Sequence, residues 1–466
     1  MNLPLHGPES TTQIVAVIKR HGATATFDLD KITGAISAAG QATGEFDTVR
    51  ARELAERVQA ALHRRVPTVE QVQDQVERTL LEAGLFETAR AYIVYRERRS
   101  TLRQDKACAV DVERSVNEYL SQQDWRVNAN ANQGYSLGGL ILNVSGKVIA
   151  NYWLGHVYPP EIGHAHREGD LHIHDLDMLA GYCAGWSLRT LLHEGLKVEA
   201  GPPKHLSSAV GQIVNFLGTL QNEWAGAQAF SSFDTYLAPY VRQDRLSYAQ
   251  VRQCIQELVY NLNVPSRWGT QTPFTNLTFD WTCPEDLREQ VPMIAGQEMP
   301  FAYGDLQAEM DLINQAYIDV MMCGDAKGRA FTFPIPTYNI TKDFDWEHPN
   351  TERLFEMTAK YGLPYFQNFL NSDLQPHMIR SMCCRLQLDL RELLKRGNGL
   401  FGSAEQTGSL GVVTLNCARL GYLYKGDEAA LLARTDELIR LGKNSLEIKR
   451  KVIQQHMDGG LFPYTK

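Results

Sequence analysis

The chain has 466 residues, of which 44% are hydrophobic and 21% charged, a composition typical of a folded protein with two to four domains. Its formal net charge of -8 gives no overall basic surface for nucleic acid or an anionic membrane. The sequence contains no apolar run near the roughly 18 residues of a membrane span and no secretory signal at its start. We therefore expect a cytoplasmic protein that binds neither nucleic acid nor membrane.

The first hundred residues predict a small unit with a β-hairpin and helices. Residues 1–12 are polar and are expected to form a loose tail. A strand starting at Ile14, a turn at Gly22 and a second strand at Thr24–Phe27 predict the hairpin. Thr68 is placed to cap one of the helices that follow. Apolar spacing predicts these helices at Lys31–Gly40, Thr48–Arg64, Val69–Ala83 and Glu87–Arg103.

Three cations of this unit are candidates for binding an anion. Lys19 and Arg20 end the first strand, and Lys31 begins the first helix. The free N–H groups of a helix N-terminus also favour phosphate. A solvated basic edge would explain the same charges, so the residues alone leave both interpretations open.

The string VIKRHG, followed by FDLDKI, the helices and ARAYIVYRERR, resembles the ATP-cone, a regulatory domain that binds ATP or dATP. The resemblance covers residues 13–103 and implies that Lys19, Arg20 and Lys31 hold phosphates while isoleucines pack near the base. ATP-cones occur on several ribonucleotide reductases and on a repressor of their genes. The resemblance implies a site formed by Val17, Ile18, Lys19, Arg20, Lys31 and Ile32, with Thr68 a weaker member.

After a charged linker at residues 104–112, residues 113–466 predict a larger α/β body. Short strand candidates at Leu171–Ile173 and Gly411–Leu415 accompany long helical stretches at Leu206–Trp224 and Ala308–Met322. The eight cysteines are dispersed and form no Cys-x-x-Cys pair, which predicts reduced thiols and gives no support for a metal site.

The adjacent pair Cys383-Cys384 carries the strongest chemical signal of the body. By themselves, neighbouring cysteines can be small buried hydrophobes, a strained redox disulfide or half of a metal site. Several segments in the same order, however, resemble anaerobic (class III) ribonucleoside-triphosphate reductase, a glycyl-radical enzyme. They are NANANQGYSLGGL (128–140), HREGDLHIHDLD (166–177), GRAFTFPIPTYNIT (328–341), MCCRL (382–386), GSLGVVTLNCARL (408–420) and GLFPYTK (460–466).

This resemblance implies a fold, an activity and partners. The fold would be a ten-stranded α/β barrel of two five-stranded halves, incomplete here at its C-terminal side. The activity would be the reduction of ribonucleoside triphosphates to 2′-deoxyribonucleoside triphosphates under regulation by ATP and dATP. The family is a homodimer and is activated by a radical-SAM enzyme. A non-catalytic nucleotide-sensing regulator and a formate-lyase type of glycyl-radical enzyme are the alternatives.

The resemblance also assigns catalytic roles. Cys384 directly precedes an arginine and matches the thiyl cysteine at the tip of a loop, whereas relatives can carry glycine at the position of Cys383. Cys183 matches the second cysteine, which supplies hydrogen and electrons. Asn416 matches an asparagine of formate-dependent members, so formate is the expected reductant and a thioredoxin-like donor is the alternative.

Two further groups have open interpretations. His172 and His174 alternate on a predicted strand and face one side, where they would be structural histidines paired with Asp175 and Asp177 or, alternatively, metal ligands. Segments at Ser231–Ser232 and Gly402–Ser403 are candidates for binding substrate phosphates.

The sequence departs from the family at one point. The family's glycyl-radical motif, an Arg-Val-Cys-Gly-Tyr-like string, and the four-cysteine zinc site before it do not occur in the 466 residues. We therefore expect a fragment, or one piece of a split protein, that is inactive without the missing glycyl radical.

Overall fold

In this computed structural model the chain divides into two compact units, Met1–Ala109 and Val110–Lys466, here called the front unit and the main unit. The structure describes residues 14–18, 24–62, 66–96, 111–122, 135–196, 200–267, 271–372, 379–382, 386–389 and 407–465, with the backbone alone at 379–382, 386–389 and 407.

The front unit pairs a two-stranded hairpin with helices. Strand β1 runs antiparallel to β2, with Val17 opposite Ala25. Thr68 and Gln71 form a reciprocal capping box at the start of α3, so the predicted cap is confirmed. The elements are β1 (Ala16–Ile18), β2 (Thr24–Thr26), α1 (Leu29–Thr43), α2 (Thr48–Ala61), α3 (Val69–Glu82) and a last helical run at 86–96.

Apolar residues at helical spacing form the core of the front unit. Ile36, Leu54, Val58 and Leu80 are fully buried and come from three helices. Arg96 reaches back from the last helical run and pairs with Glu70, Asp74 and Glu77 of α3. Packing and this ion-pair network together hold the last helical run on α3.

The main unit is built on a six-stranded sheet in the order β10-β9-β6-β5-β4-β13. The first five of these strands are parallel, and β13 joins the edge of β4 antiparallel. Five parallel strands are one half of the expected barrel, and the α/β class is confirmed. The strands are β4 (Cys183–Trp186), β5 (Gln228–Phe230), β6 (Thr275–Phe279), β9 (Ile335–Ile340), β10 (Tyr365–Asn368) and β13 (Thr407–Ser409).

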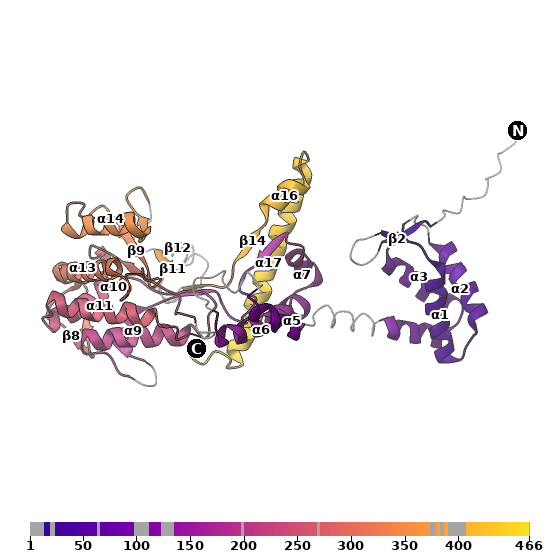
Figure 1. The fold of residues 1–466 in the computed structure, drawn as a ribbon, viewed down its shortest axis with the longest axis horizontal. Coiled ribbons are helices and arrows are strands. Elements are labelled where there is room, and N and C mark those ends of the chain that lie inside the picture. Colours follow the sequence, from indigo (N-terminus) through magenta and orange to yellow (C-terminus); the bar gives the residue numbers. More distant parts are fainter. Residues whose placement is uncertain are drawn as a thin grey trace. The chain divides into compact units, whose positions relative to one another are not determined.

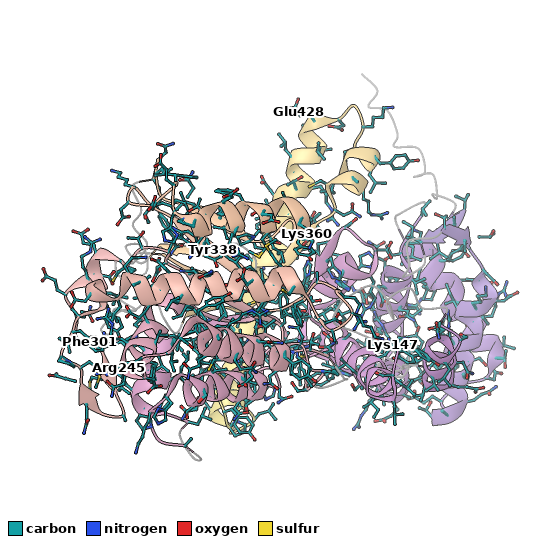
Figure 2. All side chains as sticks on the ribbon, turned by 60° about the vertical axis from the view of Figure 1, so that its left-hand side comes forward. Lys147, Arg245, Phe301, Tyr338, Lys360 and Glu428 are labelled. Carbon is teal, nitrogen blue, oxygen red and sulfur yellow. The ribbon has the colours of Figure 1, made fainter. Side chains whose placement is uncertain are left out.

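Helices connect and cover these parallel strands, as parallel pairing requires. Tyr338 of β9, labelled in Figure 2, is fully buried. Its ring stacks on that of Phe279 of β6, with 4.7 Å between the ring centroids. The helices that gather on this sheet in Figure 1 include α9, α10, α11, α13 and α14. Their bounds and those of the shorter elements are α8 (Leu188–Glu194), α9 (Leu206–Leu220), α10 (Phe233–Gln243), α11 (Tyr248–Leu262), α12 (Glu285–Arg288), β7 (Met293–Ile294), β8 (Gln297–Glu298), η4 (Tyr303–Leu306), α13 (Gln307–Cys323) and α14 (Pro349–Tyr361).

A second layer of the main unit surrounds a two-stranded ribbon. Strand β3 (Leu171–Ile173) pairs antiparallel with β14 (Val413–Leu415), which confirms both predicted strands. The second strand begins at Val413, two residues later than the predicted start at Gly411. A further hairpin, β11 (Ile379–Met382) with β12 (Leu386–Asp389), lies against β4 and β5. The helices of this layer are α5 (Val112–Leu120), α6 (Leu137–Tyr152), the π-helix η2 (Trp153–Val157), α7 (Pro160–Arg167), α16 (Cys417–Leu423) and α17 (Glu428–Asp458).

Asp170, just before β3, joins this ribbon to two distant helices. Its Oδ1 accepts a hydrogen bond from Arg419 Nε at 2.8 Å, and its Oδ2 accepts one from Arg434 Nη2 at 2.5 Å. Burial by itself raises the pKa of Asp170, but the two guanidinium groups outweigh it and hold the pKa below its usual range. Residues about 250 positions apart are thereby linked through one buried carboxylate.

Within the described residues, no helix combines the length and the apolar character needed to cross a membrane.

Replacing Asp170 tests this link. Asp170→Asn should lower the free energy of unfolding of the main unit by about 2–3 kcal/mol, because two charge-assisted hydrogen bonds are weakened. Since the folded pKa is depressed, the wild-type contribution is present at neutral pH and is lost as the pH falls through that pKa, below about pH 4. Urea unfolding at several pH values measures both effects.

The matched control is Glu447→Gln, which breaks an exposed ion pair with Arg450 on α17 and should cost under about 0.5 kcal/mol. A cost for Asp170→Asn no larger than this control would contradict the proposed link.

Candidate functional site

Cys183 lies at the start of β4, in the interior of the main unit. Its side chain is fully buried, and its backbone pairs with Ser409 of β13. Gly226, which precedes β5, approaches the sulfur so closely that a Cβ there would lie 2.5 Å from Sγ. The thiol is therefore covered by backbone rather than by solvent.

The hairpin β11–β12 brings the sequence around the cysteine pair near the same strand. In this hairpin Met382 of β11 pairs with Leu386 of β12, and β11 lies against β4 and β5. Cys383 and Cys384 stand between these strands in the sequence and lie outside the described residues, so the structure places their flanking backbone beside the strand that begins with Cys183.

Asn416 occupies a different position in the main unit. It caps α16, with its side-chain oxygen accepting from the N–H of Arg419 at 3.0 Å and its Nδ2 donating to the carbonyl of Gly169 at 2.9 Å. These bonds belong to the β3–β14 ribbon, whereas Cys183 belongs to the six-stranded sheet. The role of Asn416 toward a reductant stays a prediction.

Three histidine rings contact one another at strand β3, one pair stacked and the other edge to face. The rings of His166 and His172 lie 5.2 Å apart, and those of His172 and His174 lie 4.6 Å apart. His174 Nε2 shares a hydrogen bond with the hydroxyl of Thr414, rather than with the aspartates expected as partners. Within the described part of the chain, no three His, Cys, Asp or Glu residues are placed to hold a metal ion.

Two buried cations, Lys449 and Arg267, were not indicated by the sequence. Lys449 of α17 is 3% exposed, and burial lowers its pKa despite the nearby Asp175 and Asp177. Asp175 has a φ of +54°, and its buried Oδ2 has no hydrogen-bond partner among the described residues. Arg267 is 8% exposed, and its pKa is lowered to about 10 by burial. Lys449 and Arg267 stand in none of the family motifs, so only their packing reveals them.

The serine pair expected at a phosphate site lies between β5 and α10. Both serines are buried, and Ser232 has a φ of +54°. The hydroxyl of Ser232 has no partner among the described residues. Gly402 and Ser403 lie outside the described residues.

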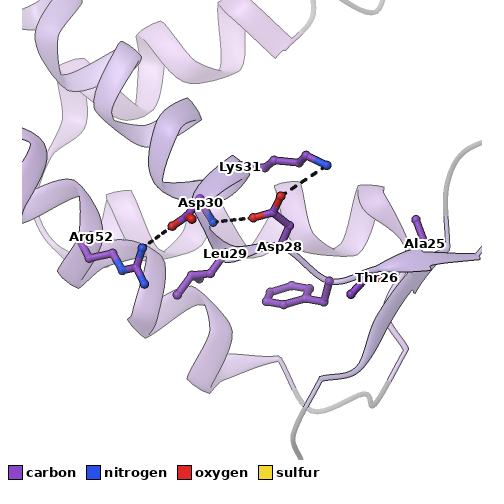
Figure 3. Close-up of a pocket in the computed structure, with 8 residues that line it drawn as sticks. Ala25, Thr26, Asp28, Leu29, Asp30, Lys31 and Arg52 are labelled. Atoms are coloured by element: carbon purple, nitrogen blue, oxygen red, sulfur yellow. Dashed lines mark hydrogen bonds and ion pairs between the residues drawn. The ribbon is translucent and has the colours of Figure 1, made fainter.

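The front unit carries an open hollow of about 490 Å³ at the start of α1 (Figure 3). Lys31 is 82% exposed, and its Nζ lies 3.5 Å from Asp28 Oδ2. Arg52 pairs with Asp30 and with Glu56. Both cations are therefore paired with carboxylates that an incoming phosphate would have to displace. The hollow is lined by Ala25, Thr26, Phe27, Asp28, Leu29, Asp30, Lys31 and Arg52.

The hollow is not lined by Val17, Ile18, Ile32 or Thr68, which were also expected to bind the nucleotide. Ile18 donates its N–H to the carbonyl of Pro67 and bridges to Thr68, so the end of β1 meets the start of α3. Val17 packs on the core of the front unit, and Ile32 is buried in it. Lys19 and Arg20 lie outside the described residues.

Comparison with protein families gives two matches. A family model described as anaerobic ribonucleoside-triphosphate reductase matches residues 129–466, and one described as the ATP cone domain matches residues 15–101. Anaerobic ribonucleoside-triphosphate reductases from Salmonella typhimurium and Escherichia coli are each 25% identical to this chain, in alignments that cover 92% of it. The chain spans 62% of the length of each of these relatives.

Further matches concern the front unit and the fold. A vitamin B12-dependent ribonucleoside-diphosphate reductase from Mycobacterium tuberculosis is 41% identical over 91 residues, covering 20% of this chain and 13% of that protein. A crystal structure of the anaerobic ribonucleotide reductase from Thermotoga maritima in complex with dATP and CTP aligns with a TM-score of 0.56 at 19% identity. That alignment covers 78% of this chain and 63% of the other, and it supports the fold.

The titration of His166 tests whether its ring is buried beside His172 and His174. Burial, together with His172, Arg167 and His174, lowers the pKa of His166 to about 4. The unfolded chain binds this proton near pH 6.5, so the free energy of unfolding should fall as the pH drops from 7 toward 4. His166→Asn removes the titrating ring and retains an acceptor for the N–H of Ile173.

Urea unfolding of this variant between pH 7 and 4.5 should show a decline smaller than that of wild type by about 1–2 kcal/mol. His164→Asn, an exposed histidine on the same helix α7, serves as the control and should keep the wild-type decline. Equal declines in wild type and His166→Asn would contradict the assigned burial.

Proposed function

This chain belongs to the anaerobic ribonucleoside-triphosphate reductase family, and we propose that it provides the cysteine site that reduces ribonucleoside triphosphates to 2′-deoxyribonucleoside triphosphates. The observation that carries this proposal is the position of Cys183. It is fully buried on β4, beside the hairpin whose strands flank Cys384 in the sequence.

The proposed reaction begins with a thiyl radical on Cys384. It takes the 3′ hydrogen of the ribose, forming an S–H bond and a carbon radical from which the 2′ hydroxyl leaves as water after protonation. Cys183 then supplies a hydrogen to the 2′ carbon and becomes a thiyl radical, which leaves a 3′ ketone. This radical takes the hydrogen of formate, and the radical anion so formed gives its electron to the ketone, which takes up a proton, and leaves as carbon dioxide. The resulting 3′ carbon radical regains its hydrogen from Cys384, which restores the thiyl radical there. Burial suits this chemistry, because a thiol covered by backbone is protected from competing reactions with solvent.

Formate is the proposed reductant. One formate and one proton balance the overall reaction, which yields the deoxyribonucleotide, carbon dioxide and water. Asn416 lies at the exposed N-terminus of α16, and we propose that its amide orients formate when the substrate is bound. A thioredoxin-like donor is the alternative, and dependence of turnover on formate distinguishes the two.

The front unit is proposed to bind ATP and dATP and to regulate the main unit. The hollow at α1 is large enough for phosphate groups, and Lys31 can leave Asp28 because exposed ion pairs contribute little free energy. Lys19, Arg20 and Lys31 would hold the phosphates. Val17, Ile18, Ile32 and Thr68 complete the proposed site.

The proposed partners follow from the family. They are the ribonucleoside triphosphate substrates, a radical-SAM activating enzyme and a second copy of the chain in a homodimer. A glycyl radical would oxidise Cys384, and the 466 residues contain no motif that could carry it. A structural zinc ion is proposed only for the polypeptide that carries that motif.

Nucleotide binding tests the regulatory part of the proposal. Calorimetric titration with ATP and dATP should show saturable binding by wild type, and Lys19→Ala/Lys31→Ala should raise the dissociation constant at least about tenfold, a loss of about 1.4 kcal/mol or more. Arg78→Ala removes an exposed cation of α3 far along the helix from Thr68 and should bind as wild type does. A folded wild-type chain that binds neither nucleotide would contradict the site.

Anaerobic turnover tests the catalytic part. With the activating enzyme, ATP, formate and CTP, the 466-residue chain alone should form no dCTP, whereas adding a polypeptide with the glycyl-radical motif should permit it. In that reconstituted enzyme Cys384→Ala or Cys183→Ala should abolish dCTP formation, while Cys323→Ala, an exposed thiol, should not. Turnover by the isolated chain, or by either cysteine variant, would refute the assigned roles.

A further inference from the structure

The segment 221–227, between α9 and β5, covers the sulfur of Cys183. The N–H of Ala225 donates to the carbonyl of Gly181 at 2.9 Å, and that of Gly226 donates to the carbonyl of Tyr182. The close approach of Gly226 to Sγ therefore follows from backbone pairing on both sides of the contact. Whatever holds this segment in place also fixes the surroundings of the thiol.

Arg267 is the side chain that holds the segment most directly. Its Nε donates to the carbonyl of Gln221 at 3.1 Å, and its Nη2 donates to the carbonyls of Trp224 at 2.8 Å and Ala225 at 2.9 Å. A planar guanidinium group suits this task, because its donors diverge at fixed angles toward several acceptors. The group is buried, so breaking these bonds would leave both a charge and three carbonyls poorly satisfied.

The same segment is tied to the sheet and to the last described residues. Gln221 Nε2 donates to the carbonyl of Phe274, next to β6, at 2.7 Å. The carboxylate of Glu223 accepts from the backbone N–H groups of Tyr464 at 2.9 Å and Thr465 at 2.7 Å. Arg267 thus acts on a segment that is anchored at several points and has little freedom to rearrange while the guanidinium is present.

We infer that Arg267 is a positioning residue for Cys183: it holds the segment 221–227 over the sulfur and so controls access to the thiol. The inference rests on the proposed role of Cys183 in hydrogen transfer. It adds that the shielding of this thiol depends on Arg267. Among the described contacts, Arg267 makes no hydrogen bond to the sulfur and acts instead through backbone carbonyls.

The test is the rate at which iodoacetamide alkylates individual cysteines in the native 466-residue chain, followed by peptide mass spectrometry. Arg267→Gln should accelerate alkylation of Cys183 at least tenfold. Cys283, buried elsewhere in the main unit, and the exposed Cys323 should keep their wild-type rates. Arg242→Gln, which removes an arginine bound to Glu309, is the matched control and should leave the alkylation rate of Cys183 unchanged.

Two further variants keep the test decisive if Arg267→Gln does not fold. Arg267→Lys retains the buried charge but lacks the planar guanidinium group. It should therefore accelerate the alkylation of Cys183 by a smaller factor than Arg267→Gln does. Gly226→Ala should also accelerate the alkylation of Cys183, because the added methyl group must displace the segment 221–227 from the sulfur.

Unchanged alkylation of Cys183 in the folded variants would overturn the inference. Equal acceleration of Cys183 and Cys283 would overturn it as well, since it would indicate general loosening of the main unit. These outcomes are independent of dCTP formation: alkylation measures how Cys183 is covered, whereas the activity of Cys183→Ala measures whether the thiol is used.

Discussion

Hydrogen bonds from buried side chains to the backbone hold both ends of the strands of the six-stranded sheet, and the main unit depends on these bonds. At the amino end, the guanidinium of Arg267 satisfies the carbonyls of a segment that would otherwise lie unpaired beside β4. At the carboxyl end, the fully buried Asp234 accepts from the N–H groups of Asp280 and Trp281 and from Asn314 Nδ2, while burial raises its pKa. Each end is thus held by a charged or ionisable group that is hydrogen-bonded to backbone.

This arrangement fits the radical chemistry that we propose for Cys183. A reactive sulfur needs a fixed, shielded environment, and the backbone of Gly226 close to Cys183 contributes to one. The ribbon formed by β3 and β14 is anchored separately, through Asp170 to Arg419 and Arg434. The two anchors join residues far apart in the sequence, so the site depends on the packing of the main unit as a whole.

Local sequence signals predicted the front unit well. The hairpin and the cap at Thr68 follow from residues within a few positions of one another, and the structure confirms them. The strand at Leu171–Ile173 was predicted for the same reason. Resemblance to known families supplied Cys183 as a candidate, and the structure places it fully buried at the start of β4. The partner of His174 was not predicted, because Thr414 is 240 residues away and the nearby aspartates were the natural expectation.

The sequence by itself determined the α/β class, the order of the two units and the identity of the candidate cysteines, because these depend on local periodicity, capping and motifs. Only the tertiary structure decided that Arg267 binds three carbonyls of the segment beside Cys183 and that Asn416 donates to the carbonyl of Gly169. A single arginine or asparagine in a sequence carries no sign of its burial or of its acceptors. Those are set when segments more than forty residues apart pack together and bring donors and carbonyls within hydrogen-bonding distance.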